Sequence, residues 1–470
     1  MRKKWLGILL ACVLVTGTLG GCGGQAESGT ENGTVKEEAA GGENDIIHLK
    51  YTTWSAGGEQ TAVKQAVASF EEQNPNIKVE VEFIDNANYT AKLNTLMAAG
   101  DAPNVAQLNG YLAPEYGAKG QLLDLKPYLE EQVDFDDILP EALFEYDDKV
   151  WGMTFGVECQ LVFYNRDLFR QTGLEEPSTD ANNPWTWDEY VTAARKLTTD
   201  INGKHPEEAG FDINNISVWG TKVFDGPVFN FTLLNSNGGA YIAAEGDRLL
   251  IDSAESKEVL KSLQDLIYVE KVAPKPSVTS AMPSSQQMLM DGQLGMYIGG
   301  QYEIATFAEA EYGDFGVAPL PVFKKPASMI WGEPLVVYDS KDEKVNAAAV
   351  KLVLALGNPA EVSDLFITGA QMPIYKSWYS DPEKLKVWTD NPWHNEKLMS
   401  YFDSLFKTET TSREAYYVKN YDPIMAIVQP RLDKIWDGQD VNDALDGIQE
   451  EVKPEMQGYY KLVNYYSDAQ

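Results

Sequence analysis

Two hydrophobic periods alternate along the chain after residue 45, and this alternation restricts the fold more than any other feature. Apolar and charged residues alternate from Ile77 to Phe83, which is typical of a half-buried strand. From Glu59 to Gln73, apolar residues instead recur at helical spacing. Because strands and helices alternate in this way, the sequence predicts a parallel sheet covered by helices. Its elements are expected at residues 48–54, 59–73, 77–83, 89–99 and 104–108.

A second α/β unit is predicted further along the chain. Thr186 and Glu189 have capping-box spacing and open a helix that runs through Leu197. The other elements of this unit are a strand at 160–165, a helix with Leu260, Leu263 and Ile267 on one face, a short helix at 286–291 and a strand at 295–298. The segment 330–369 returns to strand and helix, and the end of the chain is mostly helical. A chain of 470 residues is long enough for two domains.

The start of the chain has the pattern of an export signal. Three basic residues precede an apolar run that is too short to span a membrane, and the run ends in Leu19-Gly20-Gly21-Cys22. This ending resembles the bacterial lipobox, in which the cysteine is acylated and becomes the new N-terminus. We therefore expect a lipoprotein signal peptide at 1–21, lipidation of Cys22, and a disordered tether at 22–45, which is rich in Gly, Glu, Ser and Thr. A plain secreted protein cut nearby is the alternative.

Charge and residue usage narrow the function classes. The formal net charge is −33, which argues against nucleic acid as a partner. Three separated histidines offer no metal-ligand spacing, so no metal and no cofactor are expected. The chain has no nucleophile elbow and no phosphate-binding loop, and Cys159 is expected to be a buried structural thiol. We therefore expect a protein that is not an enzyme. A secreted glycoside hydrolase stays open as the enzyme alternative, because abundant carboxylates could supply an acid pair.

Five short segments stand out along the chain: FEEQNPNIKV at 70–79, AAGDAPNV at 98–105, YNRDLF at 164–169, PWTWDE at 184–189 and GQLGM at 292–296. Together and in this order they resemble the extracellular solute-binding proteins of bacterial ABC importers, in the carbohydrate-binding group that includes maltose-binding protein. Asn104 stands where that family usually has Asp, and Gly295 stands where it usually has Ala.

The resemblance implies an α/β, two-lobed periplasmic-binding-protein-like fold. Each lobe would be a helix-flanked, mainly parallel sheet, the hinge would be crossed more than once, and the ligand would bind in the interlobe cleft. We expect lobe one at 46–157 plus 320–372 and lobe two at 158–319 plus 373–470.

The resemblance also implies a function. The expected protein is a monomeric receptor on the outer face of the cell membrane, held there by lipid on Cys22, or on the periplasmic side if the source has an outer membrane. It would capture a carbohydrate, an oligosaccharide, and deliver it to the permease subunits of an ABC importer. The same fold binding a polyamine, a metal complex or a peptide is the alternative. The negative charge favours a cation, whereas the Trp and Tyr residues expected at strand ends favour a sugar.

A sugar site needs aromatic rings for the C–H faces and polar groups for the hydroxyls. The family presents such residues in loops at strand ends, and it places a ligand carboxylate at the first crossing, where Glu158 lies. A solvated acid at Glu158, core packing of Trp54, Phe229 or Trp331, and core or surface roles for Tyr417 and Tyr421 remain alternatives. The candidates are Trp54, Asn109, Tyr111, Glu158, Asp225, Phe229, Gln301, Tyr302, Trp331, Glu333, Tyr417 and Tyr421.

Overall fold

The computed structural model describes residues 46–223, 227–407 and 417–460, so the signal, Cys22 and the tether lie outside the described residues. A six-stranded sheet has the strand order β2-β1-β3-β12-β5-β4. Strand β1 runs parallel to β2 and β3, whereas β12 is antiparallel to both β3 and β5. The bounds are β1 (Ile47–Thr53), β2 (Ile77–Phe83), β3 (Val105–Gln107), β4 (Leu143–Tyr146), β5 (Lys149–Thr154) and β12 (Pro334–Val337).

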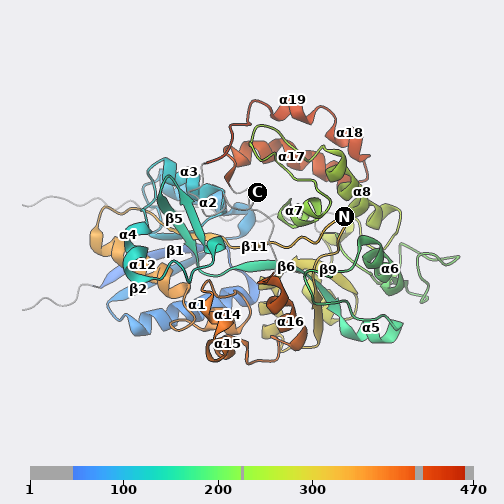
Figure 1. Ribbon diagram of the computed structural model, residues 1–470, viewed down its shortest axis with the longest axis horizontal. Coiled ribbons are helices and arrows are strands. Elements are labelled where there is room, and N and C mark those ends of the chain that lie inside the picture. Colours follow the sequence, from blue (N-terminus) through green and yellow to red (C-terminus); the bar gives the residue numbers. More distant parts are fainter. Residues whose placement is uncertain (1–45, 224–226, 408–416, 461–470) are drawn as a thin grey trace, which may run out of the picture. The chain divides into compact units, whose positions relative to one another are not determined.

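Helices cover both faces of this sheet because its strand residues alternate in direction (Figure 1). Val105 packs with α1 (Gly57–Gln73) and α12 (Glu343–Leu356) in one apolar cluster. Its neighbour Ala106 packs on the other face with α2 (Asn86–Ala98) and α3 (Leu112–Ala118). The predicted strand at 77–83 and the predicted helix ending at Gln73 are confirmed, which confirms the α/β expectation for this part of the chain.

A second sheet is built around β6 (Glu158–Asn165), whose residues are all buried. The neighbours of β6 are β9 (Met296–Gly300), β10 (Phe315–Ala318) and β11 (Ile330–Trp331). All three run antiparallel to β6, so the expectation of a mainly parallel sheet is wrong for this part. The physical reason is that antiparallel neighbours need no helical crossover between them. Cys159 on β6 is a free, buried thiol, as predicted.

Helices also enclose the second sheet. Helix α6 (Trp187–Leu197) begins with the predicted capping box, in which the Thr186 and Glu189 side chains bond each other's backbone N–H groups. Helix α17 (Tyr421–Trp436) packs against α8 (Ala254–Tyr268), α18 (Val441–Leu445) and α19 (Ile448–Val452). The apolar face of α17 joins the same core cluster as alternate residues of β6 and β9. Figure 1 shows α17, α18 and α19 grouped together, in red.

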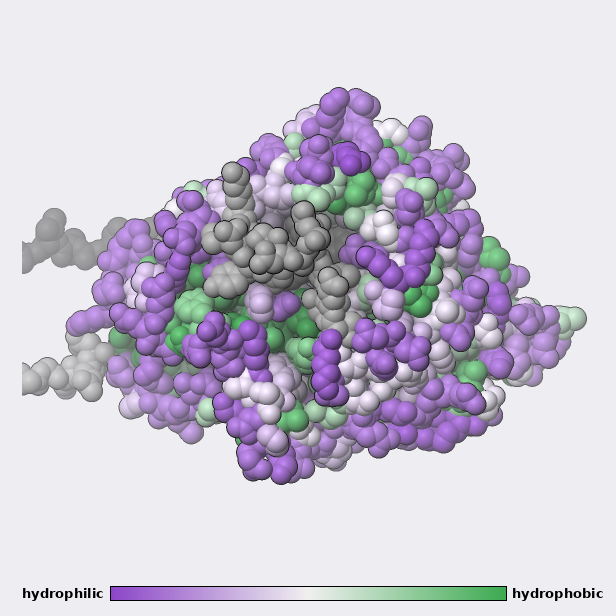
Figure 2. Space-filling view, viewed as in Figure 1, coloured by the Kyte–Doolittle hydropathy of each residue, from purple (hydrophilic) through white to green (hydrophobic). Residues whose placement is uncertain are grey.

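The remaining elements are short or lie at the periphery. None of the helices in the described ranges is both long and apolar enough to cross a membrane. Hydrophilic side chains cover most of the face drawn in Figure 2.

The remaining helices and strands are α4 (Lys126–Gln132), η1 (Pro140–Ala142), α5 (Arg166–Thr172), β7 (Thr199–Asp200), β8 (Ile216–Val218), α7 (Pro227–Ser236), α9 (Pro276–Thr279), α10 (Ser285–Met290), η2 (Gln301–Glu303), α11 (Ile304–Glu309), α13 (Asp364–Ile367), α14 (Ser377–Ser380), α15 (Pro382–Thr389) and α16 (Glu396–Leu405).

The connections between the two sheets lie against one another. Residues 155–157 join β5 to β6, and residues 332–333 join β11 to β12. Val157 and Met372 exchange two backbone hydrogen bonds of 2.9 and 3.0 Å. The segment around Met372 therefore lies beside the connection at 155–157. A Cβ on Gly156 would lie 2.4 Å from Cβ of Gln371, so only glycine fits there. The residue boundaries expected for the two lobes stay predictions.

Replacing Gly332 with alanine is expected to lower the free energy of unfolding by about 1–3 kcal/mol. The added methyl group would clash with a backbone atom, which cannot move aside by changing rotamer as a side chain can. The new Cβ would lie 2.6 Å from the carbonyl oxygen of Gly156. Gly357→Ala is the matched control, since its nearest contact is a methyl group of Ile374 at 3.1 Å. Urea denaturation measures both variants, and equal losses would contradict tight packing at Gly332.

Candidate functional site

Two carboxylates share one amide group where the connections between the sheets meet. Nε2 of Gln371 donates to Oε1 of Glu158 at 2.9 Å and to Oε1 of Glu59 at 3.3 Å. Glu158 is the first residue of β6 and is 8% exposed, and Glu59 lies in the first turn of α1. Three elements that are distant in sequence therefore converge on one polar cluster.

Burial dominates the electrostatics of this acid pair. Burial raises the pKa of Glu59 to about 7, against the opposing effect of hydrogen bonds from Gln371 and Ser55. The pKa of Glu158 is raised well above its usual range by burial and by the neighbouring charges of Glu59 and Glu333, against the hydrogen bond from Gln371. The pair therefore resists carrying two negative charges and retains a proton into the neutral range. A carboxylate beside a carboxylic acid can both accept and donate hydrogen bonds.

A third carboxylate joins the site from the connection between β11 and β12. Oε2 of Glu333 accepts a hydrogen bond from the backbone N–H of Gly110 at 2.6 Å. This bond fixes the loop between β3 and α3, in which Asn109 is half-buried and accepts a hydrogen bond from the N–H of Leu112. Glu333 therefore links its own loop, between β11 and β12, to the loop that carries the predicted residues Asn109 and Tyr111.

Aromatic rings gather beside the carboxylates. Trp331 pairs with Glu158 across β11 and β6, is 4% exposed, and forms a small apolar cluster with Met329 and Tyr417, which is 3% exposed. Tyr302 packs against the same cluster. Burial raises the pKa of Tyr302 well above its usual range, and the charges of Glu303, Glu158 and Glu59 reinforce the shift.

The ring of Tyr302 packs closely against the backbone of Gly300, two residues earlier in the chain. A Cβ on Gly300 would lie 2.1 Å from the Tyr302 ring, so a larger residue there would displace the ring. Tyr111 and Tyr421 stack on each other, with ring centroids 4.2 Å apart. These rings, together with Glu158 and Glu333, are predicted residues that the structure brings together.

Four other predicted residues make other contacts or lie outside the described part of the chain. Trp54 is half-buried and packs edge-on against Tyr89, with centroids 4.9 Å apart. Gln301 is fully buried, and its Nε2 donates to the carbonyl oxygen of Gly369 at 2.5 Å. Asp225 lies outside the described residues, and Phe229 lies in α7 with its side chain outside them.

Sequence reasoning missed Glu59 and Gln371. Glu59 follows the Gly57-Gly58 pair at the end of the first strand, which is the same strand-end position that pointed to Trp54. That signal could have identified Glu59. Gln371 lies in an irregular segment, and only the pairing of Met372 with Val157 brings it to the acids.

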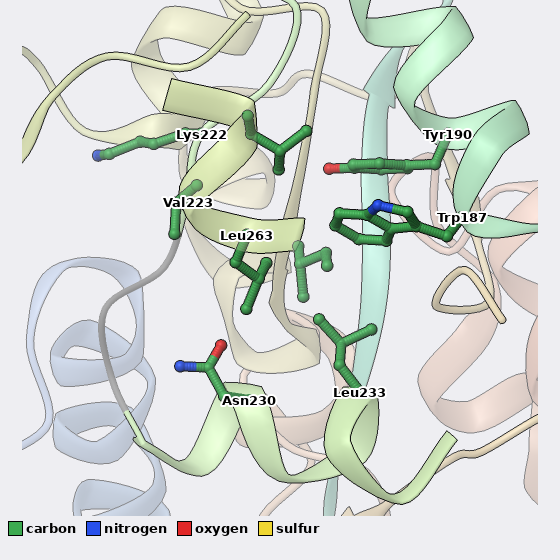
Figure 3. A pocket seen from close by; sticks show the side chains of 9 residues that line it. Trp187, Tyr190, Lys222, Val223, Asn230, Leu233 and Leu263 are labelled. Atoms are coloured by element: carbon green, nitrogen blue, oxygen red, sulfur yellow. The ribbon is translucent and has the colours of Figure 1, made fainter. Parts of the chain in front are cut away.

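An apolar pocket lies among α6, α7, α8 and β9, away from the acids (Figure 3). Figure 3 shows Trp187 and Tyr190 on one side and Leu233 and Leu263 on another. The pocket has room for about one water molecule, which is too little for a sugar ring. The acid and aromatic group at the connections is therefore the stronger candidate site.

Comparison with known proteins gives concordant results. Residues 54–362 match the family of bacterial extracellular solute-binding proteins. The chain is 25% identical to an arabinooligosaccharide-binding protein from Halalkalibacterium halodurans over 225 residues, which span 47% of this chain and about half of that relative, 46%.

Solved structures share the fold across nearly their whole length. An ABC substrate-binding protein from Listeria monocytogenes in complex with cycloalternan superposes with a TM-score of 0.74 at 26% identity, covering 88% of this chain and 99% of that one. A maltose-bound protein from T. maritima superposes with a TM-score of 0.70 at 23% identity, covering 87% of this chain and 99% of that one. These superpositions confirm the two-lobed fold.

Glu59→Gln is expected to flatten the dependence of stability on pH. In the wild type the folded Glu59 keeps its proton up to about pH 7, whereas the unfolded chain loses it near pH 4.5. The folded state therefore binds more protons between these limits and loses stability as the pH rises through them. Between pH 4.5 and about 7, the free energy of unfolding of the variant should therefore fall less than that of the wild type, by on the order of 2 kcal/mol.

Urea denaturation at several pH values between these limits measures the effect. Glu131→Gln is the control, because Glu131 is an exposed carboxylate on α4. An equally steep decline in Glu59→Gln and the wild type would contradict the protonation of Glu59 in the folded state.

Proposed function

Because the chain belongs to the family of bacterial extracellular solute-binding proteins, we propose that it captures a carbohydrate, an oligosaccharide, in the cleft between its lobes. We further propose that it delivers this sugar to the permease of an ABC importer. The observation that carries the proposal is the amide of Gln371 between Glu59 and Glu158, beside the rings of Trp331 and Tyr302. This group combines the two kinds of contact that a sugar requires.

The chemistry of the acid pair supports a neutral, hydroxylated ligand. A sugar hydroxyl donates one hydrogen bond and accepts others, and a carboxylate beside a carboxylic acid offers both partners. The apolar C–H face of a sugar ring fits against an aromatic ring. Related proteins support the same ligand class, since they bind arabinooligosaccharide, cycloalternan and maltose.

The membrane attachment belongs to the same proposal. The Leu-Gly-Gly-Cys sequence supports lipidation of Cys22, and the polar tether at 22–45 would hold the binding domain away from the membrane. We propose a monomer on the outer face of the cell membrane, with the carbohydrate, the permease subunits and the lipid bilayer as its partners.

A cationic ligand such as a polyamine is the second candidate. Glu59, Glu158 and Glu333 influence one another electrostatically, and a ligand ammonium would relieve their repulsion. Binding of a polyamine would weaken as the salt concentration rises, whereas binding of a neutral sugar would not.

A thermal-shift screen of plant and microbial oligosaccharides tests the ligand class. A bound sugar should raise the melting temperature, because it binds only the folded state. The sugar should be recovered intact afterwards. Recovery of cleaved products would support a glycoside hydrolase instead, and a response to polyamines alone would overturn the carbohydrate proposal.

Glu158→Ala is expected to weaken binding of the sugar found in that screen about 10- to 100-fold, because a hydrogen bond to an acidic group is lost. Its melting temperature without ligand should change little, because the buried acid is itself costly to the fold. Isothermal titration calorimetry measures the affinity, and Glu131→Ala on α4 is the control. Unchanged affinity would place the ligand away from Glu158.

A further inference from the structure

Three aromatic pairs join the C-terminal part of the chain to elements of the first sheet. Tyr111 stacks on Tyr421, with centroids 4.2 Å apart and an interplanar angle of 24°. Phe144 lies 6.5 Å from Tyr417, and Tyr146 meets Tyr460 edge-on at 5.2 Å. We name these six residues the aromatic seam.

The two sides of the aromatic seam belong to different sheets. Phe144 and Tyr146 are on β4, and Tyr111 precedes α3, all within or against the apolar cluster that covers the first sheet. Tyr421 begins α17, whose apolar face packs in the cluster beneath the second sheet. The pair of Tyr111 and Tyr421 therefore joins the apolar cluster on the first sheet to the cluster beneath the second.

A hydrogen bond reinforces the central pair. The hydroxyl of Tyr111 donates to the carboxylate of Asp422, the residue that follows Tyr421. Asp422 is exposed, so this bond forms at the outer edge of the stack. The Tyr111 side chain thus contacts the start of α17 through both its ring and its hydroxyl.

Backbone bonds tie the three C-terminal rings into one unit. The N–H of Tyr460 donates to the carbonyl of Tyr417 at 2.8 Å, and the N–H of Lys419 donates to Gly458 at 2.9 Å. Asn420 adopts a left-handed conformation, with φ of 60°, which turns the chain into α17. Tyr417, Tyr421 and Tyr460 therefore lie in hydrogen-bonded or adjacent segments.

We propose that the aromatic seam is a clasp that holds the two lobes together before any ligand binds. Stacking at 4.2 Å leaves no space for a sugar between Tyr111 and Tyr421, because an inserted ring needs van der Waals contact of about 3.5–4 Å on each side. These two tyrosines thus shift the equilibrium between the open and closed arrangements of the lobes. They do not serve as stacking surfaces for the ligand.

Distance measurement by pulsed electron paramagnetic resonance tests the clasp without any ligand. Nitroxide labels are placed at Gln121→Cys and Lys434→Cys, two exposed positions on opposite sides of the seam, in the full chain with Cys12→Ser and Cys22→Ser. Cys159 is buried and stays unlabelled. The parent should give one narrow, short distance distribution.

The double variant Tyr111→Ala/Tyr421→Ala should raise the ratio of open to closed molecules about fivefold or more. Tyr111→Phe, which keeps the stack and loses the bond to Asp422, should give a smaller rise, and Asp422→Ala, which removes the acceptor, should resemble it. Tyr128→Ala is the control, because Tyr128 is a tyrosine on α4, away from the seam.

Two results would overturn the clasp. One is a ligand-free parent that already shows the long distances of the double variant. The other is a double variant that keeps the short distance while its melting curve shows a folded protein. Because no ligand is present, either result leaves the proposed carbohydrate function untouched.

Discussion

The pair of backbone hydrogen bonds between Val157 and Met372 is the constraint on which the site depends. It holds the connection between β5 and β6 beside the segment that contains Gln371, and Gly156 lets them approach until Gln371 fills the space that a side chain would take. That approach carries Gln371 to Glu158, and the first turn of α1 adds Glu59. The candidate site is therefore a product of how the chain crosses between its lobes.

The site is electrostatically unfavourable for the isolated protein. Glu59 and Glu158 are held near each other by a neutral amide rather than by a cation, and burial makes their ionisation costly. Groups with strongly perturbed pKa values cluster at functional sites because a bound ligand can supply the missing partners. The aromatic pairs of the seam oppose this cost, since each such pair contributes about 0.5–1.5 kcal/mol beyond its buried area.

Local patterns predicted the elements better than their pairing. The alternation from Ile77 to Phe83 and the capping box at Thr186 are signals carried by adjacent residues, and both are confirmed. The antiparallel neighbours of β6 could not be predicted in this way, because pairing depends on contacts between distant segments.

The same distinction applies to the site. Glu158 is predicted from a family-like position and Trp331 from the Gly and the acid that follow it before a strand, and the structure brings the two together. Gln371 carries no local signal, and the stacking of Tyr111 on Tyr421 joins residues more than three hundred positions apart. No periodicity in the sequence encodes that contact.

The placement of Cys159 has a consequence for the chemical durability of the protein. Burial, reinforced by the charge of Glu158, raises the pKa of this thiol well above its usual range. The reactive thiolate is therefore scarce, and oxidants and small disulfides have no access to the sulfur atom. An exported chain built this way resists sulfenylation and mixed-disulfide formation without needing a second cysteine to protect the first.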